Sequence, residues 1–260
     1  MLYDRSNFQE LTVKVPKRII SLVPSLTEYL HSLGLNEQVL GLTKFCVHPE
    51  GWKREKHIVG GTKNLRMQTI RSLNPDLIIA NKEENEKNQV LELAKDYPVY
   101  LSVIGNFEEA INELTIIAHC CNRTPEGKMV VSQILNQKKS YQIPERSERA
   151  VYLIWKNPWM TVGGDTFIHH MMSMAGYTNV FADQERYPSL EIEELKELEP
   201  EYVLLSSEPF PFKMDHVREL KKELPNSRVW LVDGELFSWY GSRLIKSFSY
   251  FKKLQERKSR

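Results

Sequence analysis

The sequence predicts an α/β protein made of two similar lobes, because two segments recur along it in the same order. Residues 73–79 (LNPDLII) return as residues 198–204 (LEPEYVL), and each copy follows an amphipathic helical stretch and leads into an apolar strand. The proline in each copy ends the helix, so both copies predict the same helix-to-strand junction. RIISL, which begins at Arg18, is echoed by RAVYL, which begins at Arg149. Elements that recur in a fixed order indicate two copies of one structural unit.

Apolar strands alternate with helical stretches in both halves, which predicts a mostly parallel sheet in each lobe. After the first strand Pro24 interrupts the extended chain, and Ser25 with Glu28 fits a helix capping box. The predicted strands are residues 19–23, 39–43, 77–80 and 99–103 in the first half, and 151–155, 202–206 and 229–232 in the second.

A helix over residues 125–141 connects the halves, and no Gly/Ser linker lies beside it. A helix of this length resists bending, so we expect a rigid connection. The predicted organisation is an N-terminal α/β lobe at residues 1–122, a connecting helix at 123–145 and a C-terminal α/β lobe at 146–260. Two Rossmann-like lobes arranged in this way leave a cleft between them, and clefts between domains commonly bind small ligands.

Composition and charge indicate a globular chain without a nucleic-acid partner. The 260 residues suffice for two lobes with separate cores, and 41% of them are hydrophobic. The formal net charge is only +1, whereas nucleic-acid-binding proteins normally show a clear basic excess. We expect a monomer that binds no nucleic acid.

The N-terminal residues bear on location. Residues 1–15 are polar and charged, without the apolar region of a signal peptide. No apolar run approaches the ~20 residues of a membrane span, so the chain is not expected to be embedded in a membrane. As written, the sequence predicts a cytoplasmic protein; a missing leader would instead place it in the periplasm or cell envelope.

Catalytic motifs are missing, and the case for a metal site is weak. The sequence contains no G-x-G-x-x-G, phosphate-binding loop, G-x-S-x-G or H-E-x-x-H motif, so we expect no enzymatic activity. The three cysteines have neither disulfide-framework nor zinc spacing. Cys46 and His48 form the best-placed metal-binding pair, but no third ligand accompanies them. The expectation is no metal site, with this pair as the alternative.

Aromatic residues gather in the loops that follow predicted strands, where open α/β sheets place ligands. Large rings at these positions suit a flat, bulky ligand; alternatively, they seal contacts between the lobes. These residues are Phe45 and Trp52 in the first half, Trp155 and Trp159 after the first strand of the second half, and Phe237, Trp239 and Tyr240 after the last strand.

Several motifs resemble one known family. They are RIISLVPSLTE from Arg18, GLT from Gly41, Gly60-Gly61 and LNPDLIIA from Leu73, followed by TVGG from Thr161, AGYTNVF from Ala175, YPSLE from Tyr187 and VDGE from Val232. In this order, over residues 15–254, they resemble the helical-backbone substrate-binding proteins of ABC importers, which carry cobalamin, haem or ferric siderophores. The cobalamin-binding branch is the most similar.

The resemblance implies a function. The ligand, which is cobalamin, haem or a ferric siderophore, would be held between the lobes with little hinge motion and without any required cofactor. It would then be delivered to the permease of an ABC importer. Docking on the permease would use one acidic residue per lobe, at the positions of Glu86 and Glu194.

The chain departs from the cobalamin-binding pattern at two positions. Thr62 stands where a cobalamin binder would place a tryptophan, and Met160 stands where a ring would stack. The other aromatic residues would then supply the ring faces, and Lys44 or Arg243 would meet a carboxylate, amide or phosphate on the ligand rim.

Two other classes of function stay open. The chain could be a leaderless cytosolic enzyme or chaperone that handles a metal or cofactor, which predicts a metal bound through Cys46 and His48. It could also be a ligand sensor or an adaptor for a partner protein, which predicts aromatic residues covered by the protein's own side chains.

Overall fold

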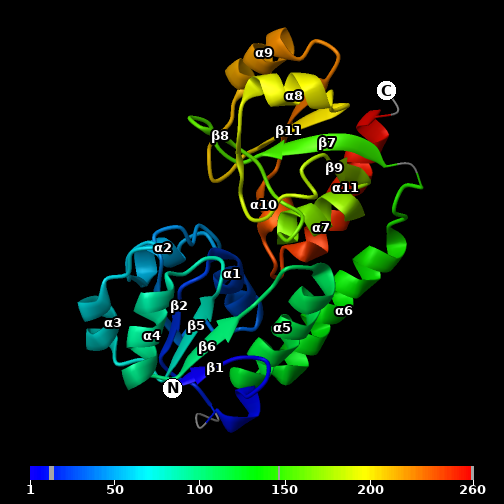
Figure 1. Ribbon diagram of the computed structural model, residues 1–260. Helices are drawn as coiled ribbons and strands as arrows, with labels where there is room; N and C mark the ends of the chain where they lie inside the picture. Colours follow the sequence, from blue (N-terminus) through cyan, green and yellow to red (C-terminus); the bar gives the residue numbers. More distant parts are fainter. Residues whose placement is uncertain (12–14, 146, 259–260) are drawn as a thin grey trace. The chain divides into compact units, whose positions relative to one another are not determined.

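The computed structural model describes residues 1–11, 15–145 and 147–258, and the chain divides into two compact units (Figure 1). Unit 1 comprises Met1–Ile104, Glu108–Asn136 and Trp239–Ile245. Unit 2 comprises Gly105–Phe107, Gln137–Ser238 and Lys246–Arg260. Each unit is described by itself below.

Unit 1 is built on a six-stranded sheet in which every pair of neighbouring strands is parallel. The strand order is β1-β6-β5-β2-β3-β4. The strands are β1 (Leu2–Tyr3), β2 (Ile19–Ser21), β3 (Val39–Leu42), β4 (His57–Ile58), β5 (Leu77–Asn81) and β6 (Val99–Ser102). The sequence did not predict β1, because Leu2–Tyr3 is too short to show an alternating pattern.

The helices of unit 1 cover the sheet, and one face carries a cluster that includes Ile20, Ile78, Ile70 and Leu93. The helical segments are η1 (Phe8–Glu10), α1 (Pro24–Ser32), α2 (Trp52–Glu55), α3 (Met67–Leu73), α4 (Lys87–Asp96), α5 (Phe107–Cys120) and α6 (Thr124–Ser140). Residue 107 of α5 and the last residues of α6 belong to unit 2.

Helix α1 begins earlier than the capping box predicted. Pro24 is its first residue, Val23 occupies the N-cap position, and no side chain caps the helix there. Proline suits this position because its fixed φ is helical and its missing N–H would have no partner in the first turn. The expected cap at Ser25 is therefore wrong, and Glu28 is left to form an ion pair described below.

Unit 2 contains a four-stranded parallel sheet of order β12-β11-β7-β9 and a two-stranded antiparallel sheet, β10-β8. The prediction of two α/β lobes with mostly parallel sheets is confirmed, and the small antiparallel pair is an addition to it. The strands are β7 (Glu148–Leu153), β8 (Trp159–Met160), β9 (Tyr177–Asn179), β10 (Ser189–Leu190), β11 (Tyr202–Ser206) and β12 (Arg228–Val232).

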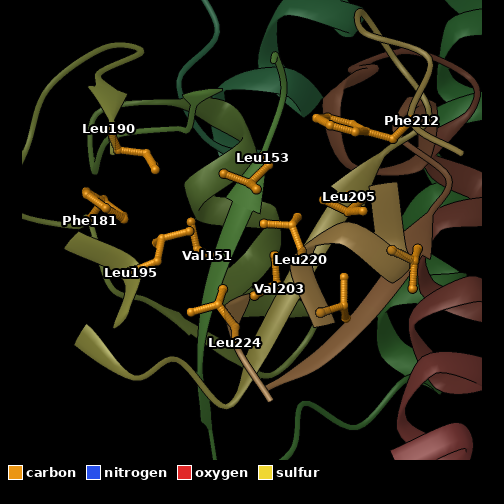
Figure 2. Packing of buried hydrophobic residues seen from close by; sticks show 12 residues of the cluster. Val151, Leu153, Phe181, Leu190, Leu195, Val203, Leu205, Phe212, Leu220 and Leu224 are labelled. Carbon is orange, nitrogen blue, oxygen red and sulfur yellow. The ribbon is translucent and has the colours of Figure 1, made fainter. Parts of the chain in front are cut away.

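Alternation along the central strands of unit 2 divides its core between two faces. Val151 and Leu153 of β7 join Val203 and Leu205 of β11 in a cluster under α8 and α9 (Figure 2). Tyr152 points to the other face, where α7, α10 and α11 lie (Figure 1). The helices are α7 (Phe167–Met174), α8 (Ile192–Leu198), α9 (Met214–Glu223), α10 (Glu235–Ser238) and α11 (Leu244–Lys258), the last beginning within unit 1.

The repeated sequence forms the same junction in both units. In unit 1, α3 ends at a left-handed residue, Asn74, with φ 43° and ψ 63°, and Arg18 Nε donates to the carbonyl oxygens of Leu73 and Asn74 at 3.0 Å. The Asp76 carboxylate accepts backbone N–H bonds from Lys17 and Arg18 at 2.8 and 2.9 Å.

Unit 2 reproduces most of these contacts. Helix α8 ends at left-handed Glu199, with φ 44° and ψ 60°. The Arg149 guanidinium donates to the carbonyl oxygens of Leu198 and Glu199, and the Glu201 carboxylate accepts the backbone N–H of Arg149 at 2.9 Å. The two junctions therefore share a left-handed residue at the helix end, an arginine bonded to the last helical carbonyl groups, and a carboxylate that accepts the N–H of that arginine; the second N–H bond to Asp76, from Lys17, is found in unit 1 alone among these contacts of the described residues.

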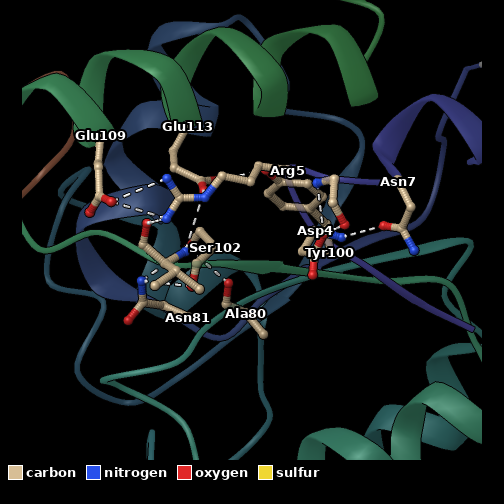
Figure 3. A network of polar contacts seen from close by, with 11 residues as sticks. Asp4, Arg5, Asn7, Ala80, Asn81, Tyr100, Ser102, Glu109 and Glu113 are labelled. Carbon is tan, nitrogen blue, oxygen red and sulfur yellow. Dashed lines mark hydrogen bonds and ion pairs between the residues drawn. The ribbon is translucent and has the colours of Figure 1, made fainter.

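A partly buried polar network ties the N-terminal segment to β6 and α5 within unit 1 (Figure 3). The Arg5 guanidinium donates to Glu109 and to the Val103 carbonyl at 3.2 Å, and it lies 3.6 Å from Glu113. The Tyr100 hydroxyl donates to the Glu113 carboxylate at 2.6 Å. Burial raises the pKa of the Glu113 carboxyl, and hydrogen bonds from Tyr100 and Val103 together with the Arg5 charge only partly oppose this effect.

This raised pKa predicts a pH-dependent stability. The native state holds the Glu113 proton more tightly than the unfolded chain, whose carboxyl has a pKa near 4.5. The stability that the protonated Glu113 carboxyl contributes is fully present below pH 4.5, and it is lost as the pH rises through the raised native pKa. The stability of the wild type relative to Glu113→Gln should therefore fall over this interval. Denaturant unfolding at a series of pH values measures the difference, with Glu37→Gln, an exposed glutamate of unit 1 outside this network, as control; parallel curves for wild type and Glu113→Gln would contradict the assignment.

Candidate functional site

In unit 1, buried hydrogen bonds hold the loops that follow the parallel strands. The Thr27 hydroxyl lies 2.7 Å from Ser21 Oγ and donates to the Val23 carbonyl at 2.8 Å. The Cys46 Sγ lies 3.1 Å from Thr27 Oγ1 and 3.2 Å from Thr43 Oγ1. These bonds join the end of β2 and the first turns of α1 to the loop after β3.

A second set of bonds adds the loop after β5 to the same frame. The Asn85 side-chain amide donates to the carbonyl oxygens of Leu22 and Thr62, each at 3.1 Å, and accepts the backbone N–H of Asn81 at 2.9 Å. Thr62 is itself buried, at 8% exposure, so its side chain offers little surface to a ligand. Thr62 acts in the structure mainly through its backbone carbonyl.

On the surface of this frame, Lys44 and Phe45 are the predicted binding residues that solvent reaches. Phe45 is 50% exposed, and Lys44 Nζ lies 5.0 Å from the centre of its ring. A Cβ atom at Gly61 would lie 3.3 Å from Phe45 Cε2, so the phenyl ring rests against the glycine backbone. The pair presents an apolar ring beside a cation.

Trp52 occupies a different environment from Phe45, although both follow β3. It is only 5% exposed, and its ring packs edge-on against His31 with centroids 5.3 Å apart. Lys56 Nζ lies 5.4 Å from the ring centre. The protein's own side chains therefore cover Trp52, which leaves little of its ring for a ligand.

The segment that contains Trp239, Tyr240 and Arg243 is also largely buried in unit 1, with both rings less than 7% exposed. The Arg243 guanidinium forms a two-pronged ion pair with Glu28, and both N–O distances are 2.8 Å. It also lies 5.0 Å from the centre of the Trp239 ring. Arg243 thus ties this late segment to α1. From the sequence, its guanidinium was expected to meet a polar group of the ligand instead.

The structure disfavours the metal alternative at Cys46 and His48. Burial raises the pKa of the Cys46 thiol, whereas a metal ligand must be the thiolate. The His48 ring packs against Trp239, with centroids 5.5 Å apart. Within residues 1–11, 15–145 and 147–258, no group of three or more His, Cys, Asp or Glu side chains is placed to hold a metal ion.

In unit 2, four rings form what we call the aromatic cluster: Trp155, Trp159, Phe210 and Phe212. Trp155 packs edge-on against Phe210 at 5.6 Å, and Phe210 contacts Phe212 at 4.7 Å. Phe212 and Trp159 are stacked, with centroids 5.9 Å apart and planes 1° from parallel. The rings come from the loops that follow the neighbouring parallel strands β7 and β11, together with β8.

The aromatic cluster is anchored in the core and open at one end. Phe212 is 6% exposed and belongs to the hydrophobic core of unit 2 (Figure 2). Trp155, at the other end, is 40% exposed. The backbone N–H of Phe210 donates to the Ile154 carbonyl at 3.3 Å and joins the two loops directly. The arrangement presents an apolar surface on a fixed base, which suits a flat, bulky ligand.

Phe237 does not belong to this cluster, in contrast to the sequence-based grouping. It lies in the short helix α10, is fully buried, and packs against Tyr152 and Phe251 at centroid distances of 5.2 and 4.9 Å. Phe237 is therefore a core residue of unit 2.

Phe210 and Phe212 were missed by the sequence analysis, although they follow the predicted strand 202–206. The signal that could have found them is the alternation Phe210-Pro211-Phe212 at a strand exit, the same rule that selected Trp155.

The two predicted docking residues lie at helix starts. Glu86 is exposed at the N-cap of α4, and Glu194 is half-buried in the first turn of α8. A negative charge at such a position is favoured by the helix dipole, so both carboxylates have a structural reason for their placement as well.

The profile of the periplasmic binding protein family matches residues 19–230. This chain belongs to the periplasmic binding protein family. The resemblance to substrate-binding proteins of ABC importers is confirmed, and so is the expectation that the chain is not an enzyme, because family members are non-catalytic binding proteins of ABC transporters.

Two relatives span most of the chain. YvrC of Bacillus subtilis (strain 168), an uncharacterized ABC transporter substrate-binding lipoprotein, is 26% identical in an alignment over 258 residues that covers 94% of this chain and 81% of the relative. The vitamin B12-binding protein of Vibrio campbellii (strain ATCC BAA-1116) is 24% identical in an alignment over 241 residues that covers 90% of this chain and 87% of the relative.

Solved structures share the fold. The periplasmic vitamin B12 binding protein BtuF of Vibrio cholerae has a TM-score of 0.78 at 21% identity and covers 93% of this chain and 98% of its own. The periplasmic heme-binding protein RhuT from Roseiflexus sp. RS-1 has a TM-score of 0.77 at 18% identity and covers 91% of this chain and 98% of its own.

The predicted cytoplasmic location is wrong. The family is periplasmic, and relatives that align over most of the chain are a lipoprotein and vitamin B12-binding proteins of ABC transport, which point to a location outside the cytoplasm. The error came from treating a polar N-terminal stretch as informative about location. Among the described residues, no helix combines the length and the apolar character needed to cross a membrane.

Because Trp52 is buried and Phe45 is half exposed, replacing them with alanine should change the free energy of unfolding by very different amounts. Trp52→Ala should lower the free energy of unfolding by about 3 kcal/mol, because it leaves a cavity in a buried site. Phe45→Ala should change the free energy of unfolding by less than about 0.5 kcal/mol, because half of its side chain already meets solvent. Guanidinium unfolding of both variants measures the difference, and an equal loss of stability would contradict this division between core and surface.

Proposed function

We propose that this chain is the substrate-binding component of an ABC importer and that its ligand is a corrinoid. Family membership supports the transport role, and the vitamin B12-binding relative that aligns over 90% of the chain supports the ligand class. The single observation that carries the proposal is the aromatic cluster, whose exposed end at Trp155 rests on a buried base.

The chemistry of the cluster fits the apolar face of a macrocycle. Trp155 and Phe210 supply flat surface, and burying it would contribute about 25 cal/mol per Å². The base formed by Phe212 and Trp159 is packed before any ligand arrives, so few side chains would have to be ordered on binding. Affinity would then come from apolar contact on a preformed surface, with no bond made or broken.

Lys44 and Phe45 of unit 1 form a second candidate surface. A ring beside an ammonium group suits the rim of a macrocycle that carries an amide, carboxylate or phosphate. We assign to this pair the role that the sequence analysis divided between Lys44 and Arg243, since the Arg243 guanidinium is bonded to Glu28. The tryptophan that Thr62 replaces would be substituted by rings elsewhere in the chain.

Delivery to a permease is part of the proposal. Glu86 and Glu194 are the proposed docking carboxylates, one in each unit and each at the start of a helix. Haem and ferric siderophores are the alternative ligands, because a haem presents the same kind of flat macrocyclic face and a ferric siderophore also presents organic surface around a chelated metal.

Titration with hydroxocobalamin, haemin and ferrichrome tests the ligand class. We expect saturable binding of hydroxocobalamin by isothermal calorimetry and tryptophan fluorescence, and a loss of affinity of tenfold or more in Trp155→Ala, which corresponds to about 1.4 kcal/mol. Trp230→Phe, which changes a buried tryptophan of β12, is the matched control and should bind as the wild type does.

The other outcomes of this titration distinguish the ligand from the transport role. Saturation by haemin or ferrichrome in place of hydroxocobalamin would reassign the ligand and keep the transport role. Binding by none of the three would overturn the proposal of a metal-chelate ligand.

A further inference from the structure

Helix α9 packs directly behind the aromatic cluster. Its residue His216 lies edge-on to Phe210 and to Phe212, and both centroid distances are 5.4 Å. The interplanar angles are 73° and 89°, the T-shaped geometry that aromatic pairs favour. One half-buried side chain therefore braces two members of the cluster.

The same imidazole also fixes the backbone that leads from the cluster into α9. The N–H of Lys213, the N-cap residue, donates to His216 Nδ1 at 2.9 Å. This is the backward half of a capping box, in which the side chain three residues into a helix satisfies the N–H at its cap. Because Nδ1 accepts this bond, the proton of the neutral ring resides on Nε2.

A second contact joins α9 to the other loop of the cluster. Glu219, three residues after His216 and hence on the same side of the helix, pairs with Lys156. Lys156 Nζ lies 5.2 Å from the centre of the Trp159 ring. The two loops that carry the cluster are thus both held from α9, one by an imidazole and the other by an ion pair.

We propose that His216 is a positioning residue for the ligand surface: its ring and its Nδ1 acceptor together hold the loop at residues 207–213 so that Phe210 is presented beside Trp155. Phe210 is the weakly held member, since it is only half-buried, whereas Phe212 is seated in the core. The effect of His216 on affinity rests on the proposed function, whereas its effect on the loop can be measured without a ligand.

Three variants separate the two contributions of His216. His216→Ala removes the ring and the acceptor. His216→Asn keeps an acceptor atom at the same distance along the side chain and loses the ring, whereas His216→Phe keeps the ring and loses the acceptor. Arg218→Ala, whose side chain is 71% exposed and pairs only with Asp215 among the ion pairs of the described chain, is the control on the same helix.

Hydrogen–deuterium exchange of the protein without ligand is the first measurement. His216→Ala should speed amide exchange in residues 207–213 while the rest of unit 2 exchanges as in the wild type, and His216→Asn should restore protection of the Lys213 amide. Unchanged exchange at 207–213 in His216→Ala, or acceleration spread evenly through unit 2, would overturn the positioning role.

Affinity for hydroxocobalamin is the second measurement. His216→Ala should weaken binding about tenfold, with intermediate losses for His216→Asn and His216→Phe and none for Arg218→Ala. Wild-type affinity in His216→Ala would refute its effect on the ligand surface. If the wild type binds no hydroxocobalamin, the corrinoid proposal fails, while the exchange measurement still decides whether His216 holds the loop.

Discussion

One arginine in each unit ties the end of a helix to the start of a parallel strand, and the remaining architecture depends on this contact. Arg18 and Arg149 stand just before or within the first residues of β2 and β7, where their guanidinium groups satisfy carbonyl oxygens that the ends of α3 and α8 would otherwise leave exposed. Asp76 and Glu201, at the entrances to β5 and β11, accept the backbone N–H groups of the arginines. Each junction therefore fixes the register between two neighbouring strands at their entrance.

Register at the entrance of parallel strands determines where the strands end, and the proposed binding residues lie at those ends. In unit 2 the loops after β7 and β11 emerge side by side, which brings Trp155 against Phe210 although 55 positions separate them (210 − 155). The core then holds Phe212, and α9 supports the loop from behind. In unit 1 the corresponding loops are joined by buried hydroxyl and amide groups, which leave Lys44 and Phe45 at the surface. A receptor that makes no chemical change to its ligand needs this kind of fixed surface, because its selectivity resides in shape and contact.

The fold was largely predictable from the sequence, whereas the candidate site was predictable only in part. Proline junctions, apolar strands and motif order are local signals, and they predicted the alternation of helices and strands in both halves. Burial of individual rings is set by packing between distant segments. Phe45 and Trp52 follow the same strand, yet one is half exposed and the other is covered by His31 and Lys56. Arg243 offered no local sign that Glu28, more than 200 positions away, would bind it. Phe210 and Phe212 follow the strand-exit rule, and a helix near residues 215–223 is predictable from the sequence, but the contacts of His216 with both rings depend on how α9 packs against the loop, which no local pattern reveals.

The central claim is that the aromatic cluster of unit 2 forms a corrinoid-binding surface. A crystal structure of the protein grown with hydroxocobalamin tests it most directly. We expect apolar atoms of the corrinoid within about 4 Å of the Trp155 indole, with Phe210 in the position that His216 supports. Corrinoid bound away from Trp155 and Phe210, with both rings contacting only protein or solvent, would contradict the account.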